Sequence, residues 1–374
     1  MLKENISLSQ LAALVFNFQI GSSIVFGLAL DAKEDAWIAL IIAFALGILI
    51  TAFYLYLSSL LPGKNLYEMF EYCFKRPIAI CLSLVYSMYF LYYACRIIRD
   101  FGELISATVL PTTPIEFSVF TLLLVIGYVL YLGLEVLART SEIFTPYAVI
   151  FMVLLCVFLY SGKNLDLSNI KPILGEGFDP LWKVIFPYEL IRPYGQLLFL
   201  TFILPSVTRL DLSSKVVMIS VIFSSLLLIA SSVLIILSLG QNIALRSNFP
   251  LLSAARLISI GEFIQRVDAI VVFTMVLGTL VKSSIYIYGG LKGLEYIFTI
   301  PFRFFAIPIS CVVSLFSIFI AKGYSDHINE GLFSNPFLLH VPLQFGLPLL
   351  LTVILLFKKW RGKHHSKQMK ERNM

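Results

Sequence analysis

The stretch IRPYGQLLFLTFILP, residues 191–205, opens with an arginine, a proline and a glycine and ends in an apolar run typical of a membrane helix. Proline removes a backbone donor and clashes with the preceding turn, and glycine lacks the side chain that restricts the backbone. We therefore expect the helix to break at Pro193, Tyr194 and Gly195. Free backbone groups are costly in hydrocarbon and are tolerated only inside protein or beside water, so the break predicts a cavity near the membrane midplane.

The rest of the chain has the composition of a multi-pass membrane protein. Of its 374 residues, 59% are hydrophobic and 13% are charged, whereas a soluble domain carries about 25% charged residues. Charge-free segments long enough to cross a bilayer as helices are residues 5–30, 36–63, 77–95, 117–134, 143–162, 216–245, 304–321 and 331–357. Two more, around 183–206 and 267–291, are interrupted by charge. We expect a ten-helix transmembrane domain over residues 1–357 and a basic tail over 358–374.

The distribution of positive charge predicts the orientation of the chain. With ten spans, both termini lie on one side of the membrane. The N-terminus, the even-numbered loops and the tail hold 16 Lys and Arg residues, and the odd-numbered loops hold 10. The positive-inside rule therefore predicts cytoplasmic termini. The basic tail is expected to bind lipid headgroups, and the net charge of +6 is not taken as a sign of nucleic-acid binding.

A second interruption matches the first. The segment FNFQIGSSIVFGLAL, residues 16–30, carries Gly21, Ser22 and Ser23 near its middle. Many transporters pair two five-helix halves through an axis in the membrane plane, and the first helix of each half is discontinuous. The expected fold is therefore all-α, with ten transmembrane helices in a 5+5 inverted repeat and breaks in helices 1 and 6. A carboxylate would suit the half-helix N-terminus after each break; close helix packing is the alternative for Gly21.

Charged and aromatic side chains inside the spans extend the predicted site. Lys282 lies near the middle of its span, where a charge usually marks a pathway. It would pair with a ligand carboxylate, occupy the position of a transported cation, or extend to a lipid headgroup. Tyr89, Tyr93 and Arg96 share one helix face, together with Tyr92. They would line a pocket or form an aromatic belt at the membrane surface.

Glu189 and Arg192 flank the break in the sixth span, and would either pair locally or gate the cavity mouth. The predicted ligand-binding residues are Gly21, Ser22, Ser23, Tyr93, Tyr194, Gly195, Gln196, Thr279, Lys282 and Ser283, and the candidate gating or ion-pair residues are Arg96, Glu189 and Arg192. We also expect a turn-rich cover over residues 163–183 and an amphipathic helix over residues 249–266.

No catalytic motif is present, so we expect neither an enzyme nor a cofactor. The chain lacks a nucleophile elbow, a phosphate-binding loop and an HExxH zinc motif. Its five cysteines show no metal-ligand spacing, and its four histidines form no metal-binding pattern.

The chain resembles the B subunits of spore germinant receptors, the endospore germination permeases of the amino acid–polyamine–organocation superfamily. The segments that carry the likeness are DAWIALIIAFALG (35–47), LPGKNLYEMFEYCF (61–74), RIIRDFGELISATVLPTTP (96–114), GLEVLARTSEIF (133–144), NIKPILGEGF (169–178), PYGQLLFLTFILP (193–205) and NFPLLSAARLISIGEFIQRVDAI (248–270). The resemblance implies a central site among helices 1, 3, 6 and 8. It also implies binding of a small nutrient germinant in the spore inner membrane, together with an A subunit and a lipoprotein C subunit.

Two departures from the family pattern bear on the ligand. Gly21-Ser22-Ser23 replaces the usual Gly-x-Gly, and Gln196 stands where an acidic residue is common. A missing carboxylate removes one partner for a ligand ammonium, which weakens the case for an amino acid and strengthens the case for a neutral ligand such as a sugar or nucleoside. The expected germinant is therefore an amino acid, a sugar or a nucleoside. A proton-coupled transporter of amino acids or amines is the main alternative, and a scaffold or ion-conducting subunit without a ligand is a third hypothesis.

Overall fold

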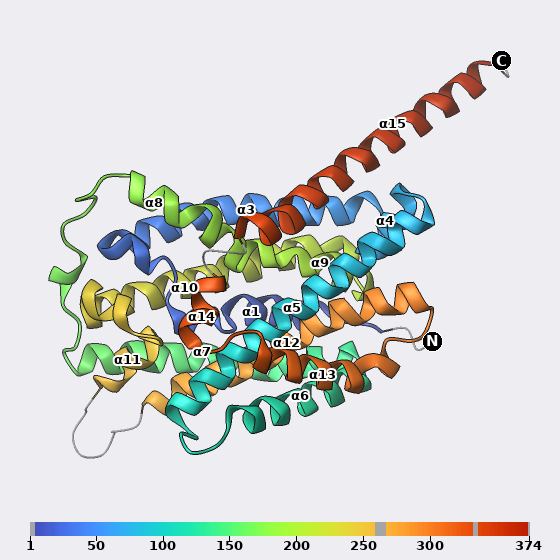
Figure 1. Ribbon diagram of the computed structural model, residues 1–374. Coiled ribbons are helices and arrows are strands. Elements are labelled where there is room, and N and C mark those ends of the chain that lie inside the picture. The colour runs from blue at the N-terminus through green and yellow to red at the C-terminus, as the bar shows by residue number, and fades with distance from the viewer. Residues whose placement is uncertain (1–3, 259–266, 332–335, 373–374) are drawn as a thin grey trace.

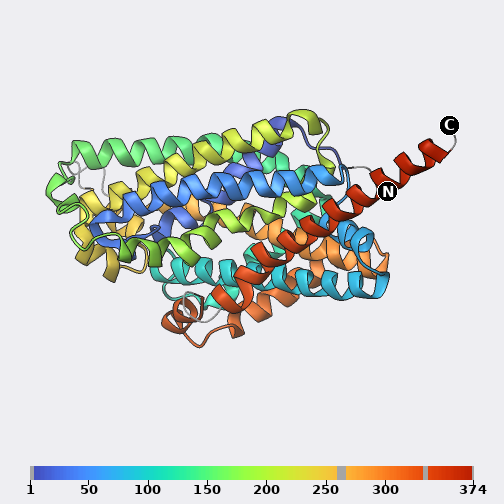
Figure 2. The same ribbon diagram turned by 90° about the horizontal axis from the view of Figure 1, so that it is seen from above.

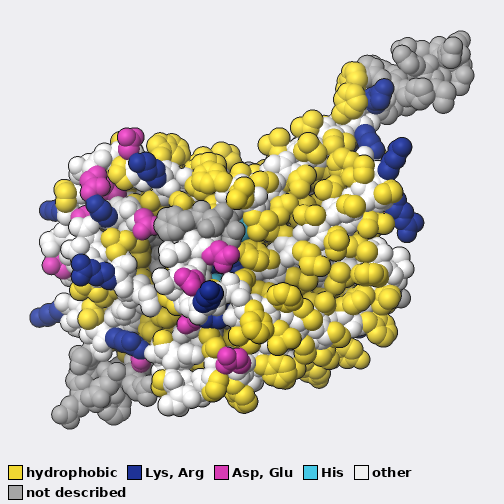
Figure 3. Space-filling view, in the orientation of Figure 1, with side chains coloured by type: hydrophobic (Ala, Val, Ile, Leu, Met, Phe, Trp, Pro, Cys, Tyr) yellow, Lys and Arg dark blue, Asp and Glu magenta, His cyan; other side chains and the backbone are white. Residues whose placement is uncertain are grey.

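The computed structural model describes residues 4–258, 267–331 and 336–372, with side chains as far as Arg361. Within these residues the regular structure is helical, apart from one isolated β-bridge between Ile6 and Val207. The long helices run broadly along one direction (Figure 1). Apolar side chains cover most of the visible flank, and charged ones gather toward one end of the bundle and beside the C-terminal helix (Figure 3). This surface fits a bilayer, as the composition predicts.

The first half of the chain contains the first broken span and four long helices. Its elements are α1 (Leu8–Ile20), α2 (Ser23–Phe26), η1 (Leu30–Asp35), α3 (Ala36–Leu60), α4 (Leu66–Cys73), α5 (Arg76–Thr108), α6 (Ile115–Leu132) and α7 (Leu134–Ser161). Polar caps fix two of the helix starts. Ser7 and Gln10 form a reciprocal capping box before α1, and Asn65 and Glu68 form another before α4.

The second half begins with a loop and the second broken span. Its elements are η2 (Leu167–Ile170), α8 (Asp179–Val184), η3 (Ile185–Tyr194), η4 (Gly195–Phe199), α9 (Leu200–Ile203), η5 (Leu204–Ser206), α10 (Leu210–Arg246), α11 (Pro250–Arg256), α12 (Asp268–Phe298), α13 (Arg303–Phe319), α14 (Tyr324–Asn329), η7 (Pro336–His340), η8 (Pro342–Gly346) and α15 (Leu347–Arg372).

Eight stretches of the described chain are long and apolar enough to cross a membrane. They correspond to eight of the ten predicted spans, and they make the chain a multi-pass membrane protein. The predicted ninth span corresponds to α13, an apolar helix of 17 residues. The predicted sixth span corresponds to the broken run from α8 to η5. The count of ten stays a prediction at these two places.

The broken spans lie at the centre of the bundle. The α1–α2 segment and α12 are the most buried of the apolar spans, and α7 is the least buried. α12 packs along α5, and α1 packs against α7, α10 and α12. α12 is continuous through Lys282, so charge interrupts its sequence but not its helix. Both chain ends lie at one end of the bundle, where α15 projects past the other helices (Figures 1 and 2).

The two predicted loop elements are partly confirmed. The segment from residue 163 to 183 is turn-rich and docks on the bundle: the Asp166 N–H donates to the Leu237 carbonyl at 2.9 Å, and the Leu174 N–H donates to Asp35. The predicted amphipathic helix is present as α11, although it packs against α2, α10 and α12 instead of lying free on a surface. Its predicted continuation over residues 259–266 lies outside the described residues.

Candidate functional site

The break in the first span has the backbone geometry that the Gly-Ser-Ser sequence predicts. α1 ends at Ile20, and Gly21 has φ 26° and ψ −127°, a conformation that side chains with a Cβ rarely adopt. Gly21 also permits close packing: a Cβ built on Gly278 of α12 would lie 2.6 Å from the Gly21 Cα. Gly21 therefore ends α1 and also lets α12 approach it closely, and its role in ligand binding stays a prediction.

The break in the sixth span is caused by prolines. Phe186 and Arg192 have extended backbone angles inside η3, and each one precedes a proline, Pro187 or Pro193. A proline disfavours helical geometry in the residue before it, so each proline interrupts the helix one position upstream. The chain then continues from Gly195 as 3₁₀ turns and the four-residue helix α9.

The expected half-helices differ between the two breaks. A half-helix whose N-terminus suits a carboxylate is predicted after each break. After the first break, α2 has only four residues, and a macrodipole needs several aligned turns, so the expectation is wrong there. After the second break, η4, α9 and η5 continue without interruption from Gly195 to Ser206, and a carboxylate site there stays a prediction.

A cavity of about 570 Å³ lies between the two breaks. Its floor and walls come from the first break, α5, η3, α12 and η7, and its rim comes from residues near η1, the end of α10, and α14. Its lining includes five predicted ligand-binding residues (Ser22, Ser23, Tyr93, Gln196 and Lys282) and all three gating candidates (Arg96, Glu189 and Arg192). The predicted cavity between the two breaks is therefore present, and its depth in the membrane stays a prediction.

The other five predicted ligand-binding residues lie buried behind the cavity wall. The Tyr194 hydroxyl donates to Ser225 of α10 at 3.2 Å. A Cβ on Gly195 would collide with the Gln344 side chain, so the absence of a side chain at Gly195 lets Gln344 pack against the backbone there. The hydroxyls of Thr279 and Ser283 are buried and have no hydrogen-bond partner among the described residues. Gly21 contacts α12, as described above.

Lys282 stays inside the bundle. Its side chain is 2% exposed, and its amine donates to the Ser23 hydroxyl across 3.3 Å and lies 5.5 Å from the centre of the Phe18 ring. No carboxylate of the described chain forms an ion pair with it. The lysine therefore links α12 to the first break, and it does not extend to the membrane surface.

The tyrosine face of α5 lines the interior. α5 continues to Thr108, well past Arg96, so these tyrosines do not mark the end of the helix. Tyr93 stacks on Tyr286 of α12, with 5.0 Å between the ring centres and 5° between the planes. Tyr89 is buried and accepts a hydrogen bond from the Gln344 amide at 2.9 Å. The pocket hypothesis is therefore favoured over the surface belt for Tyr89 and Tyr93.

Sequence reasoning missed two polar residues of the last span. His340 lines the cavity, and its Nδ1 lies 3.2 Å from the Tyr89 hydroxyl. Gln344 bridges Tyr89, Tyr93 and the second break, where Tyr54 donates to the carbonyls of both Gly195 and Gln344. Their only signal in the sequence is that they are polar within the charge-free segment 331–357.

The mouth of the cavity is crossed by α14. His327 Nε2 lies 2.8 Å from an Asp100 oxygen, and Arg96 donates to the His327 carbonyl at 2.5 Å. The Tyr324 hydroxyl donates to the Asn248 carbonyl at 3.2 Å. Burial raises the pKa of the Tyr324 phenol, so the group stays neutral and remains a donor. The contacts of His327 hold α14 against α5, and the Tyr324 hydroxyl attaches it to the segment between α10 and α11.

Glu189 and Arg192 do not pair locally, contrary to one of the two hypotheses. Glu189 is 6% exposed, and its Oε1 accepts from the Ala29 N–H at 2.9 Å. Its Oε2 is buried without a partner among the described residues. Arg192 is exposed to the cavity. Both residues therefore line the same cavity from the wall of the sixth span, without an ion pair between them.

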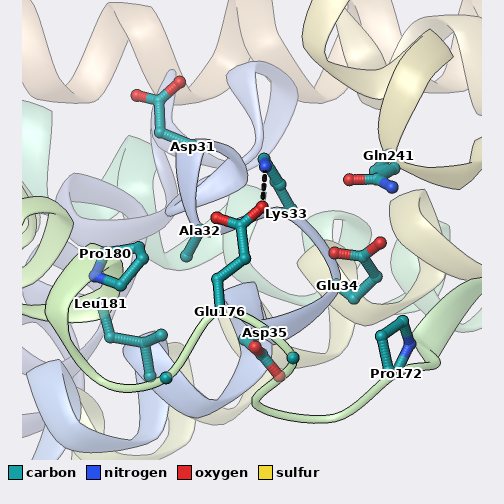
Figure 4. Close-up of a pocket in the computed structure, with 12 residues that line it drawn as sticks. Asp31, Ala32, Lys33, Glu34, Asp35, Pro172, Glu176, Pro180, Leu181 and Gln241 are labelled. Atoms are coloured by element: carbon teal, nitrogen blue, oxygen red, sulfur yellow. Dashed lines mark hydrogen bonds and ion pairs between the residues drawn. The ribbon is translucent and has the colours of Figure 1, made fainter.

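A smaller hollow of about 200 Å³ lies between η1 and the loop after α7. Figure 4 shows Lys33 of η1 joined to Glu176 of that loop. Four carboxylates line this hollow, namely Asp31, Glu34, Asp35 and Glu176. In the described part of the chain, no three acidic, histidine or cysteine side chains are grouped so that they could hold one metal ion. Its contacts attach the loop to the bundle.

The bundle is sealed at the end that holds the termini. Between the cavity and the end that holds the termini, the rings of Phe18, Phe199 and Phe202 pack in series, with 4.1 Å and 6.5 Å between successive ring centres. Glu4 then accepts from the Tyr288 hydroxyl at 3.0 Å and forms an ion pair with Arg303 at 3.7 Å. The cavity therefore opens at the end opposite the termini.

The sequence is similar to those of spore germination proteins. The sequence model of the Spore_permease family, described as "Spore germination protein", matches residues 5–324. The chain is 31% identical over 365 residues to spore germination protein KB of Bacillus subtilis (strain 168), covering 96% of this chain and 97% of that protein. It is 23% identical over 335 residues to spore germination protein YndE of the same strain, covering 88% and 89%.

The fold is similar to that of a solved transporter. Mhp1, a nucleobase-cation-symport-1 family transporter in a closed conformation with bromovinylhydantoin bound, superposes with a TM-score of 0.63 at 12% sequence identity, covering 86% of this chain and 73% of that one. This likeness confirms the predicted fold class, an all-helical membrane bundle of the transporter type with a discontinuous first and sixth segment.

Proposed function

The chain belongs to the spore germination permease family, and from this membership we propose that it is the B-type subunit of a nutrient germinant receptor in the spore inner membrane. One observation carries the proposal: both broken spans border a single cavity of about 570 Å³ with buried polar groups in its wall. Pockets of this size and mixed polarity bind small molecules. The ligand is a small germinant, and the role is binding instead of catalysis.

Signalling then follows from conformational equilibrium. A ligand that prefers one arrangement of the two breaks shifts the population toward that arrangement, and partners that contact the bundle detect the shift. The proposed partners are an A subunit and a lipoprotein C subunit. The short, irregular segments at both breaks suit this role, because few helical hydrogen bonds must change when they move.

Germination of spores tests the proposal. Spores that lack this chain are compared with the parent across a panel of amino acids, sugars and nucleosides, and we expect loss of the response to at least one nutrient. Ser22→Phe fills the cavity at the first break and should reproduce that loss at normal protein abundance. Ser59→Phe places the same ring on an exposed site of α3 and should leave the response intact. Parental responses in the deletion strain would refute the receptor assignment.

A second candidate is a proton-coupled transporter of amino acids or amines. The buried Glu189 favours it, because an unpaired carboxyl oxygen beside a cavity is the kind of group that relays protons in transporters. Sealed vesicles that contain only this chain distinguish the two. Uptake of a labelled nutrient driven by a proton gradient, and lost in Glu189→Gln, would favour transport; binding without uptake would favour the receptor.

A further inference from the structure

α7 carries an unpaired charge on a side that the bundle does not cover. It is the least buried of the described spans, with 22% of its apolar stretch inside the bundle. Glu142 is exposed and lies eight residues inside α7, about 12 Å along the helix from Leu134. Within the described residues its carboxylate forms no ion pair, and Arg139, one turn away, is paired with Glu135 at 2.6 Å.

The contacts of its neighbours show that Glu142 lies within the spans and not at their ends. Ser141 and Thr145 accept hydrogen bonds from Asn17 of α1 at 2.9 Å and 2.8 Å. Asn17 itself lies nine residues inside α1 and four residues before Gly21 of the first break. A carboxylate at this level of a membrane helix is costly in contact with lipid tails, and such charges are usually paired.

The backbone at Glu142 adds a second acceptor to the same turn. Pro146 lies inside α7 and has no N–H, so the Glu142 carbonyl, four residues earlier, lacks its ordinary helical donor. Lipid tails supply no donors. With two acids and one base, residues 135–142 also have a formal charge of −1. A complementary partner must therefore be a positively charged donor.

An apolar stripe continues from Glu142 toward the end of α7 at Ser161. Its members are exposed and recur at intervals of three or four residues, which places them on one side of the helix. They are Pro146, Ile150, Val153, Val157 and Tyr160. From Glu142 to Tyr160 the stripe is about 27 Å long, enough for a second membrane helix to lie along it. Lipid tails would cover the stripe but would leave the carboxylate without a counter-charge.

We propose that this outer face of α7, from Glu142 to Tyr160, binds a membrane-spanning helix of a partner subunit that carries a lysine or arginine opposite Glu142. The cation would form an ion pair with the carboxylate and donate to the freed carbonyl, and the rest of that helix would pack along the apolar stripe. The inference rests on the proposed function, since the partner is the A subunit of the receptor. Charge-assisted hydrogen bonds add geometric specificity, so they would also fix the register of the two helices.

This surface would lie one helix away from the cavity. Asn17 connects α7 to α1 four residues before Gly21, and the first break borders the cavity. A rearrangement of that break on ligand binding would reach the partner through α1 and α7. A helix bound to α7 would therefore be placed to detect the population shift on which signalling depends.

Photocrosslinking in spore membranes tests the surface. The full-length chain carries a photoreactive amino acid at Ile150 of the stripe or, as the matched control, at Leu315 of α13; the native side chains are 51% and 58% exposed. The probe is an epitope-tagged A subunit. We expect an adduct with the A subunit from Ile150 and none from Leu315.

Substitution of Glu142 tests the charge. With the photoreactive residue at Ile150, Glu142→Lys should lower the adduct yield roughly tenfold, because two like charges would then face each other. Glu142→Gln should lower it less, and Glu116→Lys, at an exposed site on α6, should leave it unchanged. Lys and Arg residues in the membrane helices of the A subunit are then changed one at a time to Glu, and one of these changes should restore the adduct in Glu142→Lys.

Three results would overturn the inference. Equal yields from Ile150 and Leu315 would show that the outer face of α7 contacts lipid. An adduct with a second copy of this chain in place of the A subunit would make the face a contact between copies. A yield that both Glu142 variants leave unchanged would show that the carboxylate takes no part in docking.

The outcomes for the surface and for the proposed function are separable. If the Glu142 variants do not accumulate, the comparison of Ile150 with Leu315 in the otherwise native chain still decides whether the face binds the A subunit. If spores that lack this chain keep every nutrient response while Ile150 forms its adduct, the receptor assignment falls and the docking surface stands. Loss of a nutrient response in those spores without an adduct at Ile150 overturns the docking surface alone.

Discussion

At the scale of single residues, the contact between Gly21 and Gly278 sets how closely α12 approaches the first break. A methyl group on Gly278 would meet the Gly21 backbone at 2.6 Å, and backbone cannot rotate away as a side chain can. We expect Gly278→Ala to lower the free energy of unfolding by about 1–3 kcal/mol, the usual cost of overpacking. Denaturant titration of the purified protein measures the change.

The matched control for that substitution is Gly323→Ala, because nothing lies within 4 Å of a Cβ there and the residue precedes α14 outside the spans. Its stability should be unchanged within about 0.5 kcal/mol. Equal stability of Gly278→Ala and the native chain would show that the two segments are farther apart than described.

Asn17 forms the second residue-scale contact of interest, because it joins α1 to α7 within the membrane. Its amide donates to the Ser141 hydroxyl at 2.9 Å and to the Thr145 hydroxyl at 2.8 Å. Asn17→Leu keeps the number and branching of the side-chain heavy atoms and removes the donor of both bonds. Hydrogen bonds between membrane helices contribute about 0.6 kcal/mol each on average, so we expect a loss near 1 kcal/mol. A double-mutant cycle with Ser141→Ala should show coupling, and an additive result would count against the contact.

At the scale of elements, α14 is held across the cavity mouth by a few polar contacts on α5. Asp100→Asn weakens the bond to His327 while preserving shape. We expect hydrogen exchange in residues 324–329 to accelerate about tenfold, since loss of a charge-assisted hydrogen bond of about 1.4 kcal/mol changes an opening equilibrium by that factor.

Asp326→Asn is the control for this prediction, because Asp326 lies on the same short helix with its side chain exposed. It should leave the exchange rates unchanged. If both variants exchange at the native rate, α14 is held by its apolar packing, and the Asp100–His327 pair contributes nothing to closure.

The broken sixth span shows what the sequence could predict and why. Proline acts on its immediate neighbour, so the break at Arg192 and Pro193 follows from local chemistry alone. The burial of Gly195 behind Gln344 depends on how the last span is rotated against the sixth, and no local signal encodes that rotation. His340 and Gln344 were missed for the same reason. An interior position was one of the alternatives left open for Lys282, because charges in hydrocarbon usually face the bundle interior. The structure places its side chain there, and its ligand role stays a prediction.

At the scale of the whole molecule, the bundle is asymmetric: one end opens into the cavity and the other is sealed. The spans themselves follow from hydropathy, because every backbone group in a bilayer must be bonded internally. The end at which the cavity opens cannot be predicted from hydropathy, since it depends on which end of the bundle packs more tightly. The packed rings of Phe18 and Phe199 and the bonds of Glu4 close the end with the termini, whereas the other end is spanned by short elements such as η1 and α14.

Glu4 should therefore stabilise the closed end of the bundle. It binds Tyr288 and Arg303, and two residues later the Ile6 N–H donates to the Ser206 carbonyl at the end of the sixth span. Removal of the carboxylate leaves Arg303 without its partner and frees the segment that pairs with residues 206–208. We expect Glu4→Ala to lower the free energy of unfolding by about 1–2 kcal/mol and to accelerate exchange at the Ile6 and Thr208 amides roughly tenfold. Glu116→Ala, exposed at the open end, should do neither. Accelerated exchange confined to α14 instead would place the weaker seal at the cavity mouth and contradict the assignment of the closed end.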